Sequence, residues 1–136
     1  MARSFRLRVV TPTKVVFDEE VEMVIAPGVA GELAIMAHHI ALATALKPGV
    51  IKIRKKEDES FERLSCTGGF LHVLNNDVQL LTDASEFASE IDVGRALKAR
   101  QRAEERLMHD DDVDVMRAKL AIQRALARLK TVEYEG

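Results

Sequence analysis

The sequence changes character at Ile91-Asp92-Val93-Gly94-Arg95-Ala96. Before this stretch, short runs of alternating apolar and polar residues are separated by glycine, proline and asparagine, a pattern typical of strands and turns. After it, alanine and charged residues dominate, and neither glycine nor proline occurs between Gly94 and Met108, which favours helix. The stretch therefore predicts a boundary between a β-rich region, residues 1–88, and a helical region, residues 89–136.

The β-rich region has the pattern of a sandwich or a barrel. Phe5, Leu7 and Val9 alternate with other residues, so one face of the first strand is expected to be buried. The charged run Lys55–Ser60 is expected to form a solvated loop between two further strands. Many short strands at this spacing favour two packed sheets or a barrel.

The helical region predicts an antiparallel pair of helices. Ser89 or Asp92 can cap the first helix, and the acidic run Asp110–Asp114 breaks it and can cap a second one. The second helix has an apolar stripe at alternating spacings of three and four, made of Val115, Ala118, Ile122, Ala125, Leu129 and Val132. The first helix offers mostly alanine to the seam, so we expect the hairpin to open at modest cost.

Composition limits the classes of function. A chain of 136 residues can bury one ordinary core, and its net charge of −2 hides a basic segment, residues 92–131, with ten basic and seven acidic residues. This local excess favours a compact anion or an acidic protein surface over nucleic acid.

Cys66 is the one cysteine, so an intramolecular disulfide is excluded, and its strand context predicts a buried thiol. The longest apolar run, Ile40–Leu46, is too short to span a membrane, so membrane association is expected only through partners.

Four arginines form the most informative pattern. Arg95 and Arg102 share a face of the first helix, Arg124 and Arg128 share a face of the second, and antiparallel pairing places Arg95 level with Arg128. Arg124 and Arg128 repel each other at a spacing of four, which suggests an anion supplied from elsewhere. Four guanidinium groups near one groove suit a triphosphate, because each can donate two parallel hydrogen bonds to phosphate oxygens.

Two acidic residues could complete a nucleotide site. Asp92 and Glu86 could accept hydrogen bonds from an adenine amine or from ribose hydroxyls. The sequence contains no phosphate-binding glycine loop and no evident base to activate water, so we expect a binding site without hydrolysis. The alternative is a solvated or protein-facing basic surface, in which Asp92 caps the helix and pairs with Arg95 while Glu105 pairs with Arg102.

The sequence gives little support for a metal-binding or a catalytic function. The adjacent His38 and His39 would point to opposite faces of a strand, and neither they nor His72 and His109 belong to a set with metal-ligand spacing. Combinations typical of nucleophilic catalysis are not recognisable either. We expect neither a metal site nor a catalytic residue.

The order of several segments resembles the epsilon subunit of bacterial F-type ATP synthases over nearly the whole chain. The matching segments are Leu7–Pro12, Gly31–Ile35, His39–Leu42, Thr67–Val73 and Ile91–Ala96. The last of these matches the nucleotide-binding pattern of the family, which reads Ile or Leu, Asp, two variable residues, Arg and Ala.

The resemblance implies an N-terminal ten-stranded β-sandwich followed by a C-terminal two-helix hairpin. It implies a peripheral rotor subunit on the cytoplasmic face of the cell membrane, with the sandwich docked on the gamma subunit and the c-ring. It also implies that the extended hairpin reaches the beta subunits and inhibits ATP hydrolysis, and that ATP, alone or with Mg²⁺, stabilises the folded, permissive hairpin. The implied nucleotide-binding residues are Glu86, Ile91, Asp92, Arg95, Ala96, Arg102, Arg124 and Arg128.

One loop departs from the family pattern. The family usually has Leu-Pro-Gly-His-Ile-Pro where this chain has Met36-Ala37-His38-His39-Ile40-Ala41, so we expect an altered backbone there. The predicted partner contacts are Glu32, His38 and His39 near this loop, and a basic helical surface of Arg100, Arg106, Arg117 and Lys119. Two other functions remain open: a structural coupling subunit without a nucleotide site, and a free-standing nucleotide-sensing module.

Overall fold

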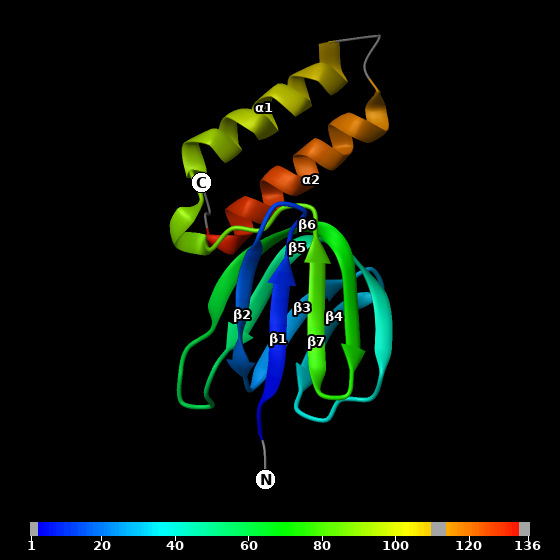
Figure 1. Ribbon diagram of the computed structural model, residues 1–136. Coiled ribbons are helices and arrows are strands. Elements are labelled where there is room, and N and C mark those ends of the chain that lie inside the picture. The colour runs from blue at the N-terminus through cyan, green and yellow to red at the C-terminus, as the bar shows by residue number, and fades with distance from the viewer. Residues whose placement is uncertain (1–2, 110–113, 134–136) are drawn as a thin grey trace.

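The computed structural model describes residues 3–109 and 114–133. These ranges form a β-sandwich followed by a pair of helices (Figure 1). The strands are β1 (Phe5–Val10), β2 (Val15–Val21), β3 (Met23–Gly28), β4 (Gly31–Met36), β5 (Leu42–Arg54), β6 (Glu62–Leu74) and β7 (Asp77–Thr82). The helices are the 3₁₀ helix η1 (Ala88–Glu90) and the α-helices α1 (Val93–His109) and α2 (Val115–Thr131).

The strands form one hydrogen-bonded sheet that folds over on itself. Its order is β2-β1-β7-β6-β5-β3-β4, with β1 and β7 parallel and the other neighbours antiparallel. The predicted inward positions Phe5, Leu7 and Val9 are at most 1% exposed and pack in the same core as Val24 and Ile35 from the other end of the sheet. The alternating pattern thus identified the buried face of β1 correctly.

The expectation of ten strands is wrong for the part of the chain that the structure describes, which has seven. The reason lies in β5 and β6, which are each 13 residues long and pair in one unbroken register from Leu42–Val73 to Ile53–Glu62. Gly68 and Gly69 adopt positive φ angles of 104° and 144°, which lets β6 bend without leaving the ladder. Each long strand therefore continues through both layers where shorter strands were expected.

The predicted hairpin is present, and each helix is capped by a residue that was predicted as a possible cap. The Asp92 Oδ1 atom accepts a hydrogen bond from the backbone N–H of Arg95 at 3.0 Å, and Asp114 Oδ1 accepts one from the backbone N–H of Arg117 at 3.2 Å. Ser89, the alternative cap, lies in η1 instead. The two α-helices have 17 residues each.

Helix α2 is buried on two sides because it packs against α1 and also against β5 and β6. Ala118, Ala125 and Leu129 of the predicted stripe are buried, and Ala127 and Thr131 are buried on the opposite side of the helix. Val115, which opens the predicted stripe, is 49% exposed. A single apolar stripe therefore describes only one of the two packed faces of α2.

The hairpin lies across the end of the sandwich at which β1 and β7 terminate (Figure 1). Two ion pairs join α2 and the residue after its cap to the rest of the chain: Arg128 Nε to Glu86 Oε1 at 3.0 Å, and Arg63 Nη1 to Glu133 Oε1 at 2.6 Å. Of the helices described, none is long and apolar enough to cross a membrane.

Candidate functional site

A pocket of about 470 Å³ lies where the segment after β7 meets α1 and α2. We call it the inner pocket, and its lining residues are Glu86, Glu90, Asp92, Arg95, Ala96, Ala99, Arg102 and Arg128. Six of these belong to the nucleotide-binding set implied by the sequence. Its volume is in the range of pockets that hold small ligands.

The start of α1 positions Asp92 at the mouth of this pocket. Its Oδ1 atom caps the helix through the backbone N–H of Arg95, and its carbonyl accepts the first helical hydrogen bond, from Ala96 at 3.1 Å. One carboxylate oxygen is thereby used in capping, while the side chain as a whole stays exposed. Capping and ligand contact are therefore compatible at Asp92, because a carboxylate has two oxygens.

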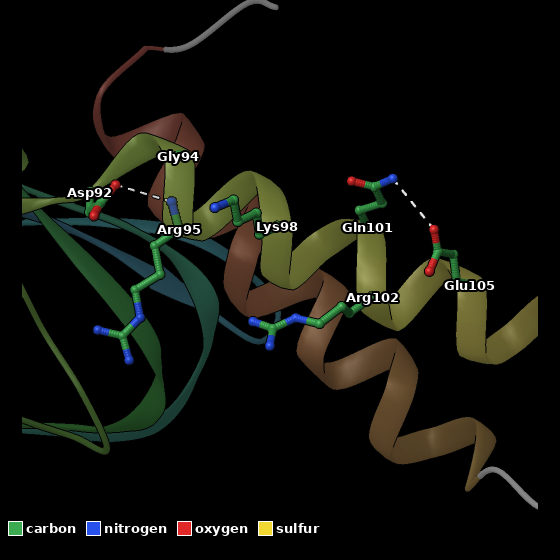
Figure 2. A pocket seen from close by; sticks show the side chains of 7 residues that line it. All are labelled: Asp92, Gly94, Arg95, Lys98, Gln101, Arg102 and Glu105. Carbon is green, nitrogen blue, oxygen red and sulfur yellow. Dashed lines mark hydrogen bonds between the residues drawn. The ribbon is translucent and has the colours of Figure 1, made fainter.

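The side chains of Arg95 and Arg102 project from the same side of α1 (Figure 2). The alternative pairings do not form: Asp92 bonds the backbone of Arg95, and Glu105 accepts from Gln101 Nε2 at 3.4 Å. Among the described residues, no ion pair involves either guanidinium. Two cations at the mouth of one pocket thus remain available to an anion.

Arg128 enters the same pocket from α2, as the antiparallel pairing predicted for it and Arg95. Its Nε donates to Glu86 Oε1, and the two side chains are 29% and 39% exposed. The sequence identified both residues as members of the site but not their contact, because they are 42 positions apart. The pocket thus contains three arginines, one of which already has an acidic partner.

The structure brings together most, but not all, of the implied binding set. Arg124 is exposed and does not line the inner pocket, although it lies one turn from Arg128. Ile91 is 9% exposed and does not line the inner pocket, whereas Ala96 does.

A shallower cavity of about 610 Å³, the outer groove, lies on the other flank of Arg95 and Arg102 (Figure 2). It is lined by Asp92, Gly94, Arg95, Lys98, Gln101, Arg102 and Glu105. The sequence interpretation missed Lys98 and Gln101 here, and Glu90 and Ala99 in the inner pocket. Helical spacing could have indicated Lys98, because it follows Arg95 by three positions and precedes Arg102 by four, which places all three on one face of the helix.

The predicted partner-contact residues are spread over the molecule. Glu32 is exposed on β4, and His38 and His39 form the turn beyond the end of that strand. The backbone N–H of His38 donates to Asn76 Oδ1 at 2.7 Å, which places this turn beside the β6–β7 turn, at the end of the sandwich remote from the hairpin. On the helices, Arg106, Arg117 and Lys119 are exposed, whereas Arg100 pairs with Glu104 at 2.8 Å.

The part of the chain that the structure describes contains no group of three or more histidine, cysteine or acidic side chains arranged to hold a metal ion. His38 and His39 lie in one turn, and His39 Nδ1 is 2.8 Å from the carbonyl oxygen of Ile40. The side chain of His109 lies outside the part of the chain that the structure describes.

Comparisons with known proteins agree with this architecture. Residues 4–88 match the family described as ATP synthase, Delta/Epsilon chain, beta-sandwich domain, and residues 89–133 match the family described as ATP synthase, Delta/Epsilon chain, long alpha-helix domain. An ATP synthase epsilon chain from Desulforamulus reducens is 44% identical over 134 residues, covering 98% of this chain and 100% of the relative. One from Bacillus pumilus is 40% identical over 127 residues, covering 93% of this chain and 95% of the relative.

A chain in the Euglena gracilis mitochondrial ATP synthase structure, which contains OSCP, F1 and the c-ring, has a similar fold. The TM-score is 0.81 at 20% identity, over 93% of this chain and 80% of that one. At this identity the likeness concerns the fold alone.

Proposed function

The chain belongs to the ATP synthase delta/epsilon family, whose epsilon members are non-catalytic subunits of the complex, and we propose that its folded hairpin binds ATP in the inner pocket and thereby favours the non-inhibitory state. The observation that carries this proposal is the convergence of Arg95, Arg102 and Arg128 on one pocket with Glu86 and Asp92. The cations suit a phosphate chain, and the carboxylates suit the hydroxyls and the amine of a nucleoside.

Each residue type has a distinct role in this proposal. Arg95 and Arg102 bind phosphate oxygens from α1, and Arg128 does so from α2, so one ligand spans both helices of the hairpin. Asp92 holds the first turn of α1 in place through its capping oxygen and offers its second oxygen to the ligand. Mg²⁺, where it accompanies ATP, would bind to the phosphates, because the described residues provide no metal-ligand cluster of their own.

Regulation follows from linkage. A ligand that binds only the folded hairpin stabilises it by RT ln(1 + [ATP]/Kd), about 2.7 kcal/mol at a hundredfold excess over Kd. The packing of α1 on α2 rests largely on the buried Ala96, Ala103, Ala118 and Ala125, which bury little apolar area. A shift of this size moves the equilibrium between the folded and the extended hairpin about a hundredfold toward the folded form.

We further propose the setting that the family indicates. The sandwich docks on the gamma subunit and the c-ring, at the cytoplasmic face of the membrane, and the exposed Arg106, Arg117 and Lys119 reach acidic segments of the beta subunits when the hairpin extends. Support for this setting comes from relatives that are ATP synthase epsilon chains.

The second candidate is a structural coupling subunit whose basic helices inhibit by charge alone. This candidate is favoured by the exposure of Arg106, Arg117 and Lys119. These side chains can bind an acidic surface whether or not the chain has a nucleotide site. The two candidates differ in one respect: only the first makes inhibition depend on the arginines of the inner pocket.

The test is ATP hydrolysis by the cognate catalytic complex reassembled with this chain. With wild-type chain, inhibition should be relieved as ATP rises; with Arg95→Ala, it should persist to higher ATP, because the folded hairpin gains less from the ligand. A chain ending at residue 90 should not inhibit, and Lys130→Ala, a cation of α2 that lines neither cavity, should behave as wild type. Unchanged regulation in Arg95→Ala would favour the structural coupling subunit.

A further inference from the structure

Glu86 occupies an unusual position for a residue in an anion-binding pocket. Its carboxylate pairs with Arg128 inside the pocket, where a phosphate oxygen would otherwise be expected to bind. Building on the proposed nucleotide site, we propose that Glu86 is a specificity-determining residue: it acts as a built-in counterion that weakens the binding of bare phosphate anions relative to ligands that carry a nucleoside.

The backbone of Glu86 is fixed to the sandwich. Its N–H donates to Ser65 Oγ at 3.0 Å, and its carbonyl accepts from the N–H of Ser65 at 2.8 Å. Ser65 is 1% exposed in β6, so this anchor belongs to the rigid part of the molecule. The backbone of Glu86 is therefore held beside the pocket, where its carboxylate can reach an arriving ligand.

The other two carboxylates of the pocket have different partners. Glu90 Oε1 accepts from the backbone N–H of Phe87 at 3.2 Å, and Asp92 Oδ1 caps α1. Within the part of the chain that the structure describes, Glu86 is the pocket carboxylate that pairs with the guanidinium of one of the pocket's arginines. Its side chain is 39% exposed, so solvent screens its charge only in part.

The consequence depends on what the ligand carries. An inorganic polyphosphate that approaches Arg128 is repelled by the carboxylate and must replace an existing ion pair, with nothing to offer Glu86 in return. A nucleoside triphosphate meets the same repulsion but brings hydroxyl and amine donors that the carboxylate can accept. The same side chain thus lowers the affinity for the phosphate chain and raises the affinity for the nucleoside. The pocket therefore discriminates between the two ligand classes.

The test is calorimetric titration of the full chain with ATP and, separately, with inorganic tripolyphosphate. In Glu86→Gln, tripolyphosphate should bind more tightly than in wild type, by about 1.5-fold to fivefold at low salt, given the usual strength of partly exposed charge pairs. ATP should gain less or lose affinity, so the preference for ATP over tripolyphosphate should fall. The gain should shrink at high salt, because screening weakens the repulsion.

Two variants separate this role from general charge effects. Glu104→Gln removes the same charge from α1 and also frees an arginine, Arg100, but lines neither cavity, so it should leave the preference unchanged. Glu86→Asp keeps the charge and should retain most of the discrimination. Thermal melts of all variants confirm that they are folded.

The results distinguish this inference from the proposed function. If wild-type chain binds ATP but Glu86→Gln shows no gain for tripolyphosphate, or if Glu104→Gln shows the same gain, the role of Glu86 is overturned while the nucleotide site stands. If neither wild type nor Glu86→Gln binds ATP or tripolyphosphate, the nucleotide site fails and the inference fails with it.

Discussion

Gly69 lies where the backbone of β6 passes very close to that of β7. It adopts a φ of 144°, and a Cβ atom at this position would overlap the carbonyl oxygen of Leu81. Gly31 has a similar φ of 137° but has no atom within 4 Å of an added Cβ. The two glycines share the same backbone requirement and differ in the space around them.

This pair makes a stability prediction. Gly31→Ala should lower the free energy of unfolding by about 1–3 kcal/mol, the usual cost of a strained backbone, and Gly69→Ala should lower it by clearly more, because the backbone of β7 must also move. Urea unfolding of both variants measures the difference. Equal losses of unfolding free energy in the two variants would mean that the close approach of β6 and β7 adds nothing to the cost of the substitution at Gly69.

Cys66 is fully buried in β6, as its strand context predicted. Burial raises the pKa of its thiol above the ordinary value of 9.0, since the charged thiolate would lose its hydration. Below that ordinary value the thiol is protonated in both the folded and the unfolded chain. Above it, the unfolded chain releases the proton first, so stability falls as the pH rises toward the folded pKa.

We therefore expect the free energy of unfolding to decline more steeply above about pH 9 in wild type than in Cys66→Ala. Urea unfolding under reducing conditions, at neutral pH and at alkaline pH, measures the two slopes. Parallel slopes would show that Cys66 ionises equally easily in the folded and unfolded states.

The backbone conformation of His38 could not be predicted from its neighbours in the sequence. It adopts a φ of 63° at the position where the family usually has glycine, so a left-handed turn forms there without one. The contact that accompanies it, from the His38 N–H to Asn76 Oδ1, joins residues 38 positions apart. Burial at Phe5 can be predicted from local alternation and burial at Cys66 from its strand context, but a conformation fixed by a distant side chain cannot.

At the scale of elements, the helices were more predictable than the strands. A helix satisfies its backbone within itself, so caps such as Asp92 and Asp114 and the spacing of alanines indicate its bounds directly. A strand ends where its partner ends, and the continuous pairing of β5 with β6 joins residues from 9 positions apart, Ile53 with Glu62, to 31 positions apart, Leu42 with Val73. For this reason the hairpin was predicted nearly to its bounds, whereas the number of strands was not.

The cap of α2 gives a prediction for the hairpin. Asp114→Ala removes the acceptor for the Arg117 N–H and should destabilise α2 by about 1 kcal/mol, whereas Asp114→Asn should retain most of the cap. Hydrogen exchange should show faster exchange in α2 of the alanine variant and unchanged exchange in β1 and β7. Equal acceleration in the sandwich would mean that hairpin and sandwich open as one unit.

At the scale of the whole molecule, the inner pocket exists only while the hairpin is folded on the sandwich. Arg95 and Arg102 come from α1, Arg128 from α2, and Glu86 from the segment anchored on β6. The sequence could identify these residues through helical spacing and family resemblance. It could not show that Arg124 stays outside the pocket or that Glu86 pairs with Arg128, because both depend on how α2 rests on the sheet.

The most direct measurement is calorimetric titration of the isolated chain with ATP, ADP and GTP, together with Asp92→Ala and Arg128→Ala. We expect saturable one-to-one binding of ATP by wild type and weaker binding by both variants, since one loses a carboxylate and the other a phosphate ligand of the inner pocket. No heat of binding at millimolar ATP would contradict the nucleotide site and would leave the arginines as a surface for docking an acidic protein.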